Sequence, residues 1–281
     1  MNPNKIFFHS NIFISLAAVF LTLETQILLG MNPQWQPYLL FVFFAVLFEY
    51  NLHRLLSVLV NRETSNQLKS GIRKEILFWV FASGTGLFGS VFLLKWETLV
   101  VFTPLALLTL IYSILLFGSK NDRLGFRKIP FLKILLISFV WSTSTVLLPV
   151  IQSSENFDSI HTALMIAERF FFIFAIAIPF DIRDMEADRR TGLKTIPLIL
   201  NENKALSLSY LSLLVFFLIS FFHYQIRHDW FIIGAFGISA LSTYLFLRMK
   251  IFRKLSWYYY GILDGTILLQ GMLVMAFYYL K

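Results

Sequence analysis

The sequence contains no cysteine among its 281 residues. This absence excludes disulfide bridges, thiolate metal sites and a cysteine nucleophile. Charged residues are also scarce, at 14% of the chain, whereas 57% of the residues are hydrophobic and the mean hydropathy is +0.71. This composition excludes an ordinary soluble domain and is typical of a protein that crosses a membrane several times.

Sequence signatures of several common enzyme classes are missing as well. The chain has no P-loop, no GxGxxG turn, no HExxH zinc motif and no nucleophile elbow. The N-terminus does not resemble a cleavable signal, because residues 1–10 are polar and the apolar run that follows is long enough to span a bilayer.

The apolar residues form nine runs that could each cross a membrane, so we expect an all-α membrane protein with nine transmembrane helices. No linker or low-complexity tract separates the runs, and residues 1–281 are expected to form a single transmembrane domain. The predicted spans are residues 11–30, 36–58, 75–94, 98–117, 131–151, 161–181, 205–224, 230–249 and 257–280.

The basic residues predict the orientation of these spans. With the N-terminus in the cytoplasm, nine spans place 20 of the 24 Lys and Arg residues on the cytoplasmic side and three on the other, with Arg169 inside a span. Such an asymmetry follows the positive-inside rule and explains the net charge of +8 without nucleic acid. We therefore expect an integral membrane protein, in a prokaryotic inner membrane, with its C-terminus outside.

The most informative stretch follows the apolar run 170–180. If the helix continues, Asp181, Asp184 and Asp188 lie on one face, within an arc of roughly 60°. Three clustered carboxylates repel one another unless a divalent cation lies among them, and oxygen-only ligands suit Mg²⁺. Gly192 is suited to ending the helix. The alternative, a solvated loop of mixed charge, is disfavoured by the third aspartate and by the position at the end of an apolar run.

Three segments together resemble a known family. The pattern Asp181-x-x-Asp184-x-x-x-Asp188-x-x-x-Gly192-x-Lys194-Thr195-x-Pro197 is similar to the second aspartate-rich motif of the UbiA superfamily of intramembrane aromatic prenyltransferases. Tyr112-Ser113 with the basic segment 127–133 resembles another family segment, and 264–270 is a weaker likeness. Residues 180–184 also resemble residues 50–54, and both segments stand at the cytoplasmic end of a predicted span, which indicates two related helical halves around a central, cytoplasm-facing cavity.

The same resemblance implies an activity, a cofactor and partners. Members of the family use Mg²⁺ to bind a prenyl diphosphate, and they transfer its prenyl group to a lipophilic acceptor. By resemblance, the catalytic residues are Asp181, Asp184, Asp188 and Tyr112, the first three also being the metal ligands, and the diphosphate is bound by Asn51, Arg54, Arg127, Lys133 and Lys194.

The family's first aspartate-rich motif is degenerate in this chain. Asn51 is retained, but positions 52, 55 and 59 are leucine, and no acidic residue lies between Tyr50 and Arg62. Two explanations remain open. Either His53 and Arg54 hold the diphosphate directly and one Mg²⁺ remains at the second motif, or catalysis has been lost and the protein binds or transports an isoprenoid lipid.

Several other polar residues lie within the predicted spans, where charge is costly and usually faces the bundle interior. Glu168 and Arg169 are expected near the middle of the membrane, paired with each other, paired with Glu24 or placed at the acceptor. His161 and His223 are expected at the membrane interface, at the ends opposite the aspartates.

Two further acids are candidates for function or for structural pairing. Glu49 and His53 lie four residues apart and could pair on one helix face. Asp264 is the best candidate for a second functional acid. In the transporter alternative, Asp264 would act with Glu168 and Arg169 in proton-coupled movement of the lipid.

Overall fold

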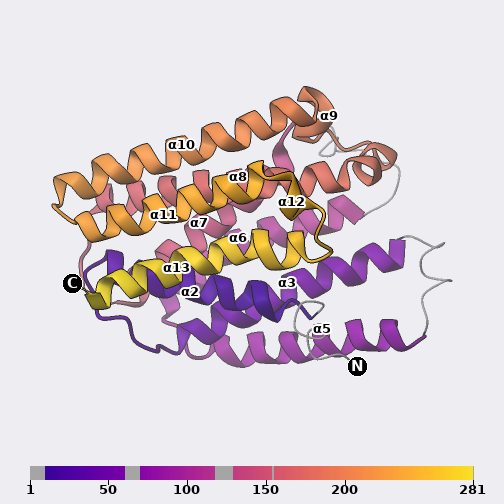
Figure 1. Cartoon of the computed structure of the whole chain (residues 1–281). Coiled ribbons are helices and arrows are strands. Elements are labelled where there is room, and N and C mark those ends of the chain that lie inside the picture. Colours follow the sequence, from indigo (N-terminus) through magenta and orange to yellow (C-terminus); the bar gives the residue numbers. More distant parts are fainter. Residues whose placement is uncertain (1–9, 61–69, 118–128, 154, 281) are drawn as a thin grey trace.

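The structure, a computed structural model, describes residues 10–60, 70–117, 129–153 and 155–280. All regular secondary structure within these ranges is helical. In Figure 1 the long helices lie side by side along one direction, and the short helices α9 and α12 lie at one end of the bundle. The helices are α2 (Ile12–Leu28), α3 (Tyr38–Val60), α5 (Ser70–Val91), α6 (Trp96–Phe117), α7 (Leu132–Gln152), α8 (Ser159–Thr191), α9 (Ile196–Leu200), α10 (Glu202–Ile226), α11 (Trp230–Arg248), α12 (Lys250–Arg253), the π-helix η2 (Tyr258–Leu263) and α13 (Asp264–Leu280).

Each of the nine predicted runs corresponds to a helix, with η2 and α13 together forming the last. Within the described ranges, seven helices are long and apolar enough to cross a membrane: α3, α6, α7, α8, α10, α11 and the η2–α13 unit. Helix α2 is apolar but shorter, with 17 residues. The all-α membrane architecture is confirmed, while the count of nine spans stays a prediction.

Helix α8 is the longest helix and packs most extensively against α10 and α7. It begins after Asp158, whose carboxylate accepts hydrogen bonds from the backbone N–H groups of Ile160 and His161. It ends at Gly192, which adopts a φ of 77°. The predicted extension of the helix through the aspartates to Gly192 is therefore confirmed. Glycine is suited to this end of the helix because it adopts the left-handed conformation at low cost.

A proline interrupts α8 just before the aspartates. Pro179 has no N–H, so the carbonyl of Ala175 loses its helical donor. The Ser209 hydroxyl of α10 donates to that carbonyl at 2.6 Å instead. The hydrogen bond from the neighbouring helix lets α8 continue through the proline within an apolar bundle.

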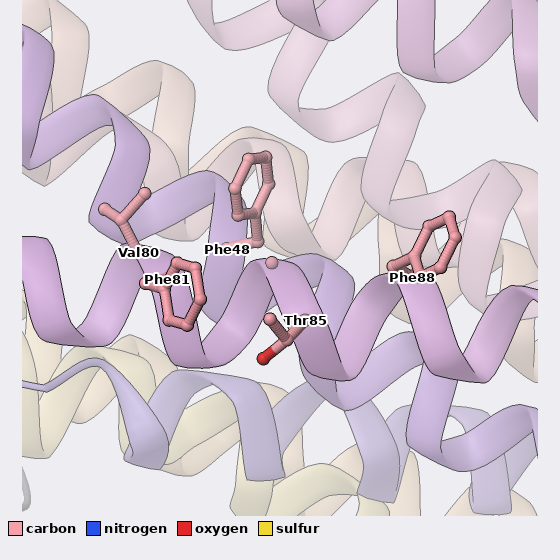
Figure 2. A pocket seen from close by; sticks show the side chains of 6 residues that line it. Phe48, Val80, Phe81, Thr85 and Phe88 are labelled. Atoms are coloured by element: carbon pink, nitrogen blue, oxygen red, sulfur yellow. The ribbon is translucent and has the colours of Figure 1, made fainter.

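Glycines allow α3 and α5 to approach closely. A Cβ atom at Gly84 would lie 3.3 Å from the Phe48 ring, and one at Gly86 would lie 2.4 Å from the Phe44 ring. Beside this contact, an apolar groove of about 400 Å³ is lined by Phe48, Val80, Phe81, Gly84, Thr85 and Phe88 (Figure 2). Its lining carries no charged side chain, so the groove suits lipid or another apolar chain and not the polar chemistry of the aspartates.

Candidate functional site

Two of the three predicted aspartates converge on one lysine. Lys133 of α7 places its Nζ 2.8 Å from Asp181 Oδ1 and 3.4 Å from Asp188 Oδ2. Asp181 and Asp188 are 1% and 7% exposed, so both carboxylates are shielded from solvent. A single ammonium group thus balances two buried carboxylates that lie two helical turns apart on α8.

The local backbone explains how Lys133 reaches this position. The N–H of Leu193 bonds to the carbonyl of Asp188, so the chain turns back directly after α8. The N–H of Phe131, just before α7, then bonds to the carbonyl of Lys194 at 3.1 Å. The segment after the aspartates is therefore tied to the start of α7, which fixes the origin of the Lys133 side chain.

The third aspartate has a different partner. Arg183 binds Asp184 through two contacts, Nε to Oδ1 at 2.7 Å and Nη2 to Oδ2 at 2.9 Å. The Arg183 guanidinium also lies 5.0 to 5.5 Å from the ring centroids of Phe180, Tyr259 and Tyr260. Cation–π contacts with three rings hold Arg183 and hence favour its pairing with Asp184. The Asp184 side chain is 34% exposed.

We call this group the aspartate end of the bundle: Asp181, Asp184, Asp188, Lys133 and Arg183. Within this group three carboxylates face two cations. No group of three or more His, Cys, Asp or Glu side chains is arranged to hold a metal ion within the described ranges. Asp181 and Asp188 can nevertheless share a cation, because both carboxylates already contact the same ammonium group of Lys133.

Three buried polar atoms of the aspartates and of nearby segments lack a hydrogen-bond partner among the described residues. Tyr112 lies where the charges of Asp181 and Asp188 act on its hydroxyl. That hydroxyl is buried and has no hydrogen-bond partner within the described part of the chain, and the same holds for Thr195 Oγ1. Asp181 Oδ1 also lacks a partner with hydrogen-bond geometry, although it pairs ionically with Lys133. Buried polar atoms are rarely left unsatisfied, so these atoms are candidates for contact with a bound ligand.

Asn51, the surviving residue of the first motif, is buried on α3. Its Nδ2 donates to the carbonyls of Ser10, at 2.9 Å, and Leu47, at 2.8 Å. Both amide hydrogens are therefore used, and only Oδ1 is left without a partner among the described residues. Asn51 in this arrangement offers an acceptor, which suits a cation or its water better than a diphosphate oxygen.

The predicted basic residues are not all placed at the aspartates. Lys194 has an exposed side chain, and its contribution to the site is the backbone contact with Phe131. Arg54 is half-buried and already makes interactions. Arg127 lies outside the described residues. Lys133 is thus the one predicted diphosphate ligand that is seen to contact the aspartates within the described ranges.

A polar cluster lies between α3 and α6, beside Tyr112. Glu49 Oε1 and His53 Nε2 are 3.2 Å apart, which confirms the expected pair. The Ser113 hydroxyl lies 2.8 Å from Glu49 Oε1 and 2.8 Å from His53 Nε2. In a Ser-His-acid relay the acid bonds to the opposite ring nitrogen from the serine. Here both approach Nε2, so the cluster is not such a relay.

The opposite half of the bundle contains a second buried polar group, which we call the histidine end: Glu24, Glu168, Arg169, His161 and His223. Arg169 Nη2 binds Glu24 Oε1 at 2.7 Å, and Arg169 Nη1 donates to the hydroxyls of Thr25 and Thr145. Gln270 of α13 donates to the same Glu24 oxygen at 3.1 Å. Of the alternatives open for Arg169, the structure has the pair with Glu24.

The two histidines belong to this network and lie inside the bundle, while their position at the level of the membrane interface stays a prediction. His161 and His223 are 4% and 6% exposed. Nδ1 of His161 lies 2.7 Å from Nε2 of His223, and Nδ1 of His223 lies 2.5 Å from Glu168 Oε1. Each imidazole thus has a buried partner on a neighbouring helix and does not depend on water for a hydrogen bond.

Sequence reasoning also missed Arg183 as the partner of Asp184 and Lys133 as the shared cation of Asp181 and Asp188. A weak signal for Arg183 was present, because it is adjacent to Asp184 and follows Phe180 on the same helix. Its other aromatic contacts, Tyr259 and Tyr260, come from η2, more than seventy residues along the chain, so no local pattern could reveal them.

Comparisons with known proteins give a consistent result. A model of the UbiA prenyltransferase family matches residues 59–257. No curated protein matches the chain. The chain is similar in fold to an apo UbiA homologue from Aeropyrum pernix K1, with a TM-score of 0.63, 15% identity, and coverage of 96% of this chain and 98% of the other. It is also similar to a UbiA homologue from Archaeoglobus fulgidus bound to DMAPP and Mg²⁺, with a TM-score of 0.55, 13% identity, and coverage of 96% and 99%.

Proposed function

This chain belongs to the UbiA prenyltransferase family, and we propose that it transfers a prenyl group from a prenyl diphosphate to a lipophilic, aromatic acceptor within the membrane. The observation that carries this proposal is the convergence of Asp181 and Asp188 on a single cation position, beside the unfilled hydroxyl of Tyr112. The Archaeoglobus fulgidus homologue bound to DMAPP and Mg²⁺ supports it, because a chain of similar fold holds that pair of ligands.

In this proposal the aspartate end binds the diphosphate. Asp181 and Asp188 would hold Mg²⁺, joined by Asp184 when Arg183 releases it. Mg²⁺, when bound, supplies positive charge that stabilises the departing diphosphate. The Lys133 ammonium would move from the two carboxylates to the diphosphate, because a compact positive charge binds phosphate oxygens favourably. The further diphosphate ligands would be Lys194, Arg54 and Arg127, whereas Asn51 would act through Oδ1 on the Mg²⁺ ion or on its water.

Tyr112 has a separate role in the proposal. Loss of diphosphate leaves an allylic cation, and an aromatic ring at its border stabilises positive charge. The apolar run 170–180 before Asp181 helps to exclude water, which would otherwise capture the cation. Attack by an electron-rich acceptor carbon would then form the new carbon–carbon bond, and the acceptor would release a proton.

The degenerate first motif favours a second candidate function. Leu52, Leu55 and Leu59 stand where the family pattern has aspartates, so half of the family's metal-binding groups are absent. The alternative is therefore a non-catalytic protein that binds or transports an isoprenoid lipid. A role for Arg169 in proton-coupled transport is disfavoured, because Arg169 pairs with Glu24 in a buried network.

Positional isotope exchange separates the two functions without knowledge of the acceptor. Geranylgeranyl diphosphate carrying ¹⁸O at the bridging oxygen is incubated with the wild type, Asp184→Asn and Glu186→Gln in nanodiscs, with Mg²⁺ or EDTA. The proposed enzyme scrambles the label with Mg²⁺ in the wild type and in Glu186→Gln, an exposed acid on the same helix. Asp184→Asn and EDTA abolish the exchange. Binding without exchange for donors of several lengths would support the binder.

A further inference from the structure

The turn between α11 and η2 is strongly basic and has no acidic residue near it in the sequence. We call residues 248–257 the basic turn, which comprises α12 and its flanking residues. Residues 230–263 contain no Asp or Glu, whereas the basic turn carries Arg248, Lys250, Arg253 and Lys254. The basic side chains of α8 differ, because Arg183 and Arg189 pair with acids on their own helix. The basic turn therefore has no acid of its own to balance its charge.

Arg253 holds the basic turn in place. Its Nη2 donates to the Leu247 carbonyl at 2.6 Å, and its Nη1 lies 3.6 Å from Glu202 Oε1 of α10. The Tyr258 hydroxyl donates to the Phe246 carbonyl at 3.3 Å. The two hydrogen bonds tie the turn to the last residues of α11, so the backbone that carries the other three basic residues is fixed.

The other three basic side chains, Arg248, Lys250 and Lys254, are exposed. Within the described ranges, none of them forms an ion pair with an acidic side chain. Arg248 donates to the Tyr244 hydroxyl and lies 5.7 Å from the centroid of that ring, so most of its N–H donors stay available. Lys250 and Lys254 are four residues apart, a spacing at which like charges on a helix repel each other. An anion bound among these cations would relieve that repulsion.

Apolar side chains of the same turn are exposed beside the cations. Met249, Ile251 and Trp257 are 45%, 65% and 50% exposed. A Cβ atom at Gly261 would lie 2.7 Å from Trp257 Cε3, so the indole rests against the backbone of η2 on one side and is open on the other. The turn joins two helices that are long and apolar enough to cross a membrane. Exposed Trp and Ile next to Lys and Arg at such a position are typical of a segment at the lipid interface.

We propose that the basic turn binds the headgroup of an anionic phospholipid. The Arg248 guanidinium can hold two phosphate oxygens, and the ammonium groups of Lys250 and Lys254 add point charges. Ile251 and Trp257 contact the first carbons of the acyl chains. A free phosphate ion would leave these apolar side chains in water, so the combination of cations and apolar groups fits a phospholipid better.

The site is distinct from the aspartate end, although both lie at the same end of the bundle. In Figure 1, α12 lies at the end where α8 leads into α9. The basic turn offers cations without carboxylates, so it binds an anion directly and requires no metal ion. The inference goes beyond the proposed function, because lipid binding here does not require that the protein transfers a prenyl group.

Native mass spectrometry of the purified full chain tests the proposal. The protein is released from detergent micelles that contain equimolar dioleoylphosphatidylglycerol and dioleoylphosphatidylcholine, two lipids with the same acyl chains and different headgroup charge. We expect the wild type to bind the anionic lipid at least about tenfold more tightly. In Lys250→Gln/Lys254→Gln its affinity should fall by about tenfold or more, because each basic residue near an anionic membrane surface contributes about fivefold.

A matched double variant separates a site from general attraction. Arg73→Gln/Lys74→Gln removes two exposed basic residues near the start of α5, on the side of the membrane predicted for the basic turn. It should bind phosphatidylglycerol as the wild type does, and thermal unfolding without lipid compares the fold of the two double variants. The proposal is overturned if the wild type binds both lipids alike, or if the two double variants lose the same affinity. Displacement of the lipid by sn-glycerol 1-phosphate at the same concentration would also overturn it, because the site would then bind free phosphate groups.

Discussion

The two ends of α8 both carry buried charge, but they balance it differently. At the histidine end, Arg169, Glu24, Glu168 and His223 are all at most 6% exposed, and their contacts join α2, α7, α8, α10 and α13. At the aspartate end, three carboxylates face two cations, and Asp184 is partly exposed. Buried charge by itself therefore does not indicate a ligand site. A carboxylate that stays partly exposed, as Asp184 does, is the better criterion.

The largest expected effect is on stability at the histidine end. Replacing Arg169 with methionine would leave the Glu24 carboxylate buried and without its cation, at a cost of about 3–5 kcal/mol. The midpoint of thermal unfolding in detergent micelles should fall accordingly. Arg227→Met, at an exposed arginine, should have little effect.

A double variant tests the cause of that instability. Glu24→Met combined with Arg169→Met removes both charges, so much of the lost stability should return. If the double variant were as unstable as Arg169→Met alone, the pair would not be the structural unit described here, and the contrast between the two ends would weaken.

The next largest effect concerns activity at the aspartate end. Asp181→Asn removes a charge from the proposed cation position, and loss of one such electrostatic contact typically costs about 10²–10³-fold in rate. The isotope exchange of the donor should fall by that factor, with a smaller change in unfolding temperature than in Arg169→Met. Exchange at the wild-type rate in Asp181→Asn would remove this residue from the catalytic site.

A smaller effect is expected between the two ends, at the proline in α8. Ser209→Ala leaves the Ala175 carbonyl without a donor and should cost about 1–3 kcal/mol of stability. In a Pro179→Ala background the same change should cost less, because a backbone N–H at position 179 restores the helical bond. Equal costs of Ser209→Ala in both backgrounds would show that the serine hydroxyl does not compensate for the proline.

The smallest effect is spectroscopic and requires no substitution. The Leu28 carbonyl lies 2.8 Å from His161 Nε2 and can only accept, so His161 must carry a proton on Nε2. With His161 neutral, His223 donates through its own Nε2, and one proton is shared between His223 Nδ1 and Glu168. Solid-state NMR of ¹⁵N-histidine should detect His161 as the Nε2–H tautomer. An Nδ1–H tautomer of His161 would contradict this arrangement.

The regular features of the fold could be predicted from the sequence. The helices follow from apolar runs of sufficient length, and the extension of α8 to Gly192 follows from the spacing of the aspartates and the glycine that ends the helix. These are local properties of a continuous segment, so composition and periodicity are enough to reveal them.

The partners of the polar residues could not be predicted in the same way. Lys133 lies 55 residues from Asp188, and His161 lies 62 residues from His223. The sequence placed both histidines at span ends and therefore at the interface, but their environment depends on which helices pack together. Pairing of Glu49 with His53 was accessible because it follows helical spacing, whereas the third member, Ser113, lies 60 residues from His53.

A thermal-shift measurement with a donor analogue tests the central claim most directly. Geranylgeranyl thiolodiphosphate and Mg²⁺ are added to the wild type, to the double variant Asp181→Asn/Asp188→Asn, and to Glu168→Gln at the histidine end. The account predicts that the ligand raises the unfolding temperature of the wild type and of Glu168→Gln, and leaves that of the double aspartate variant unchanged. An equal rise in the double aspartate variant would contradict it, because the donor would then bind elsewhere.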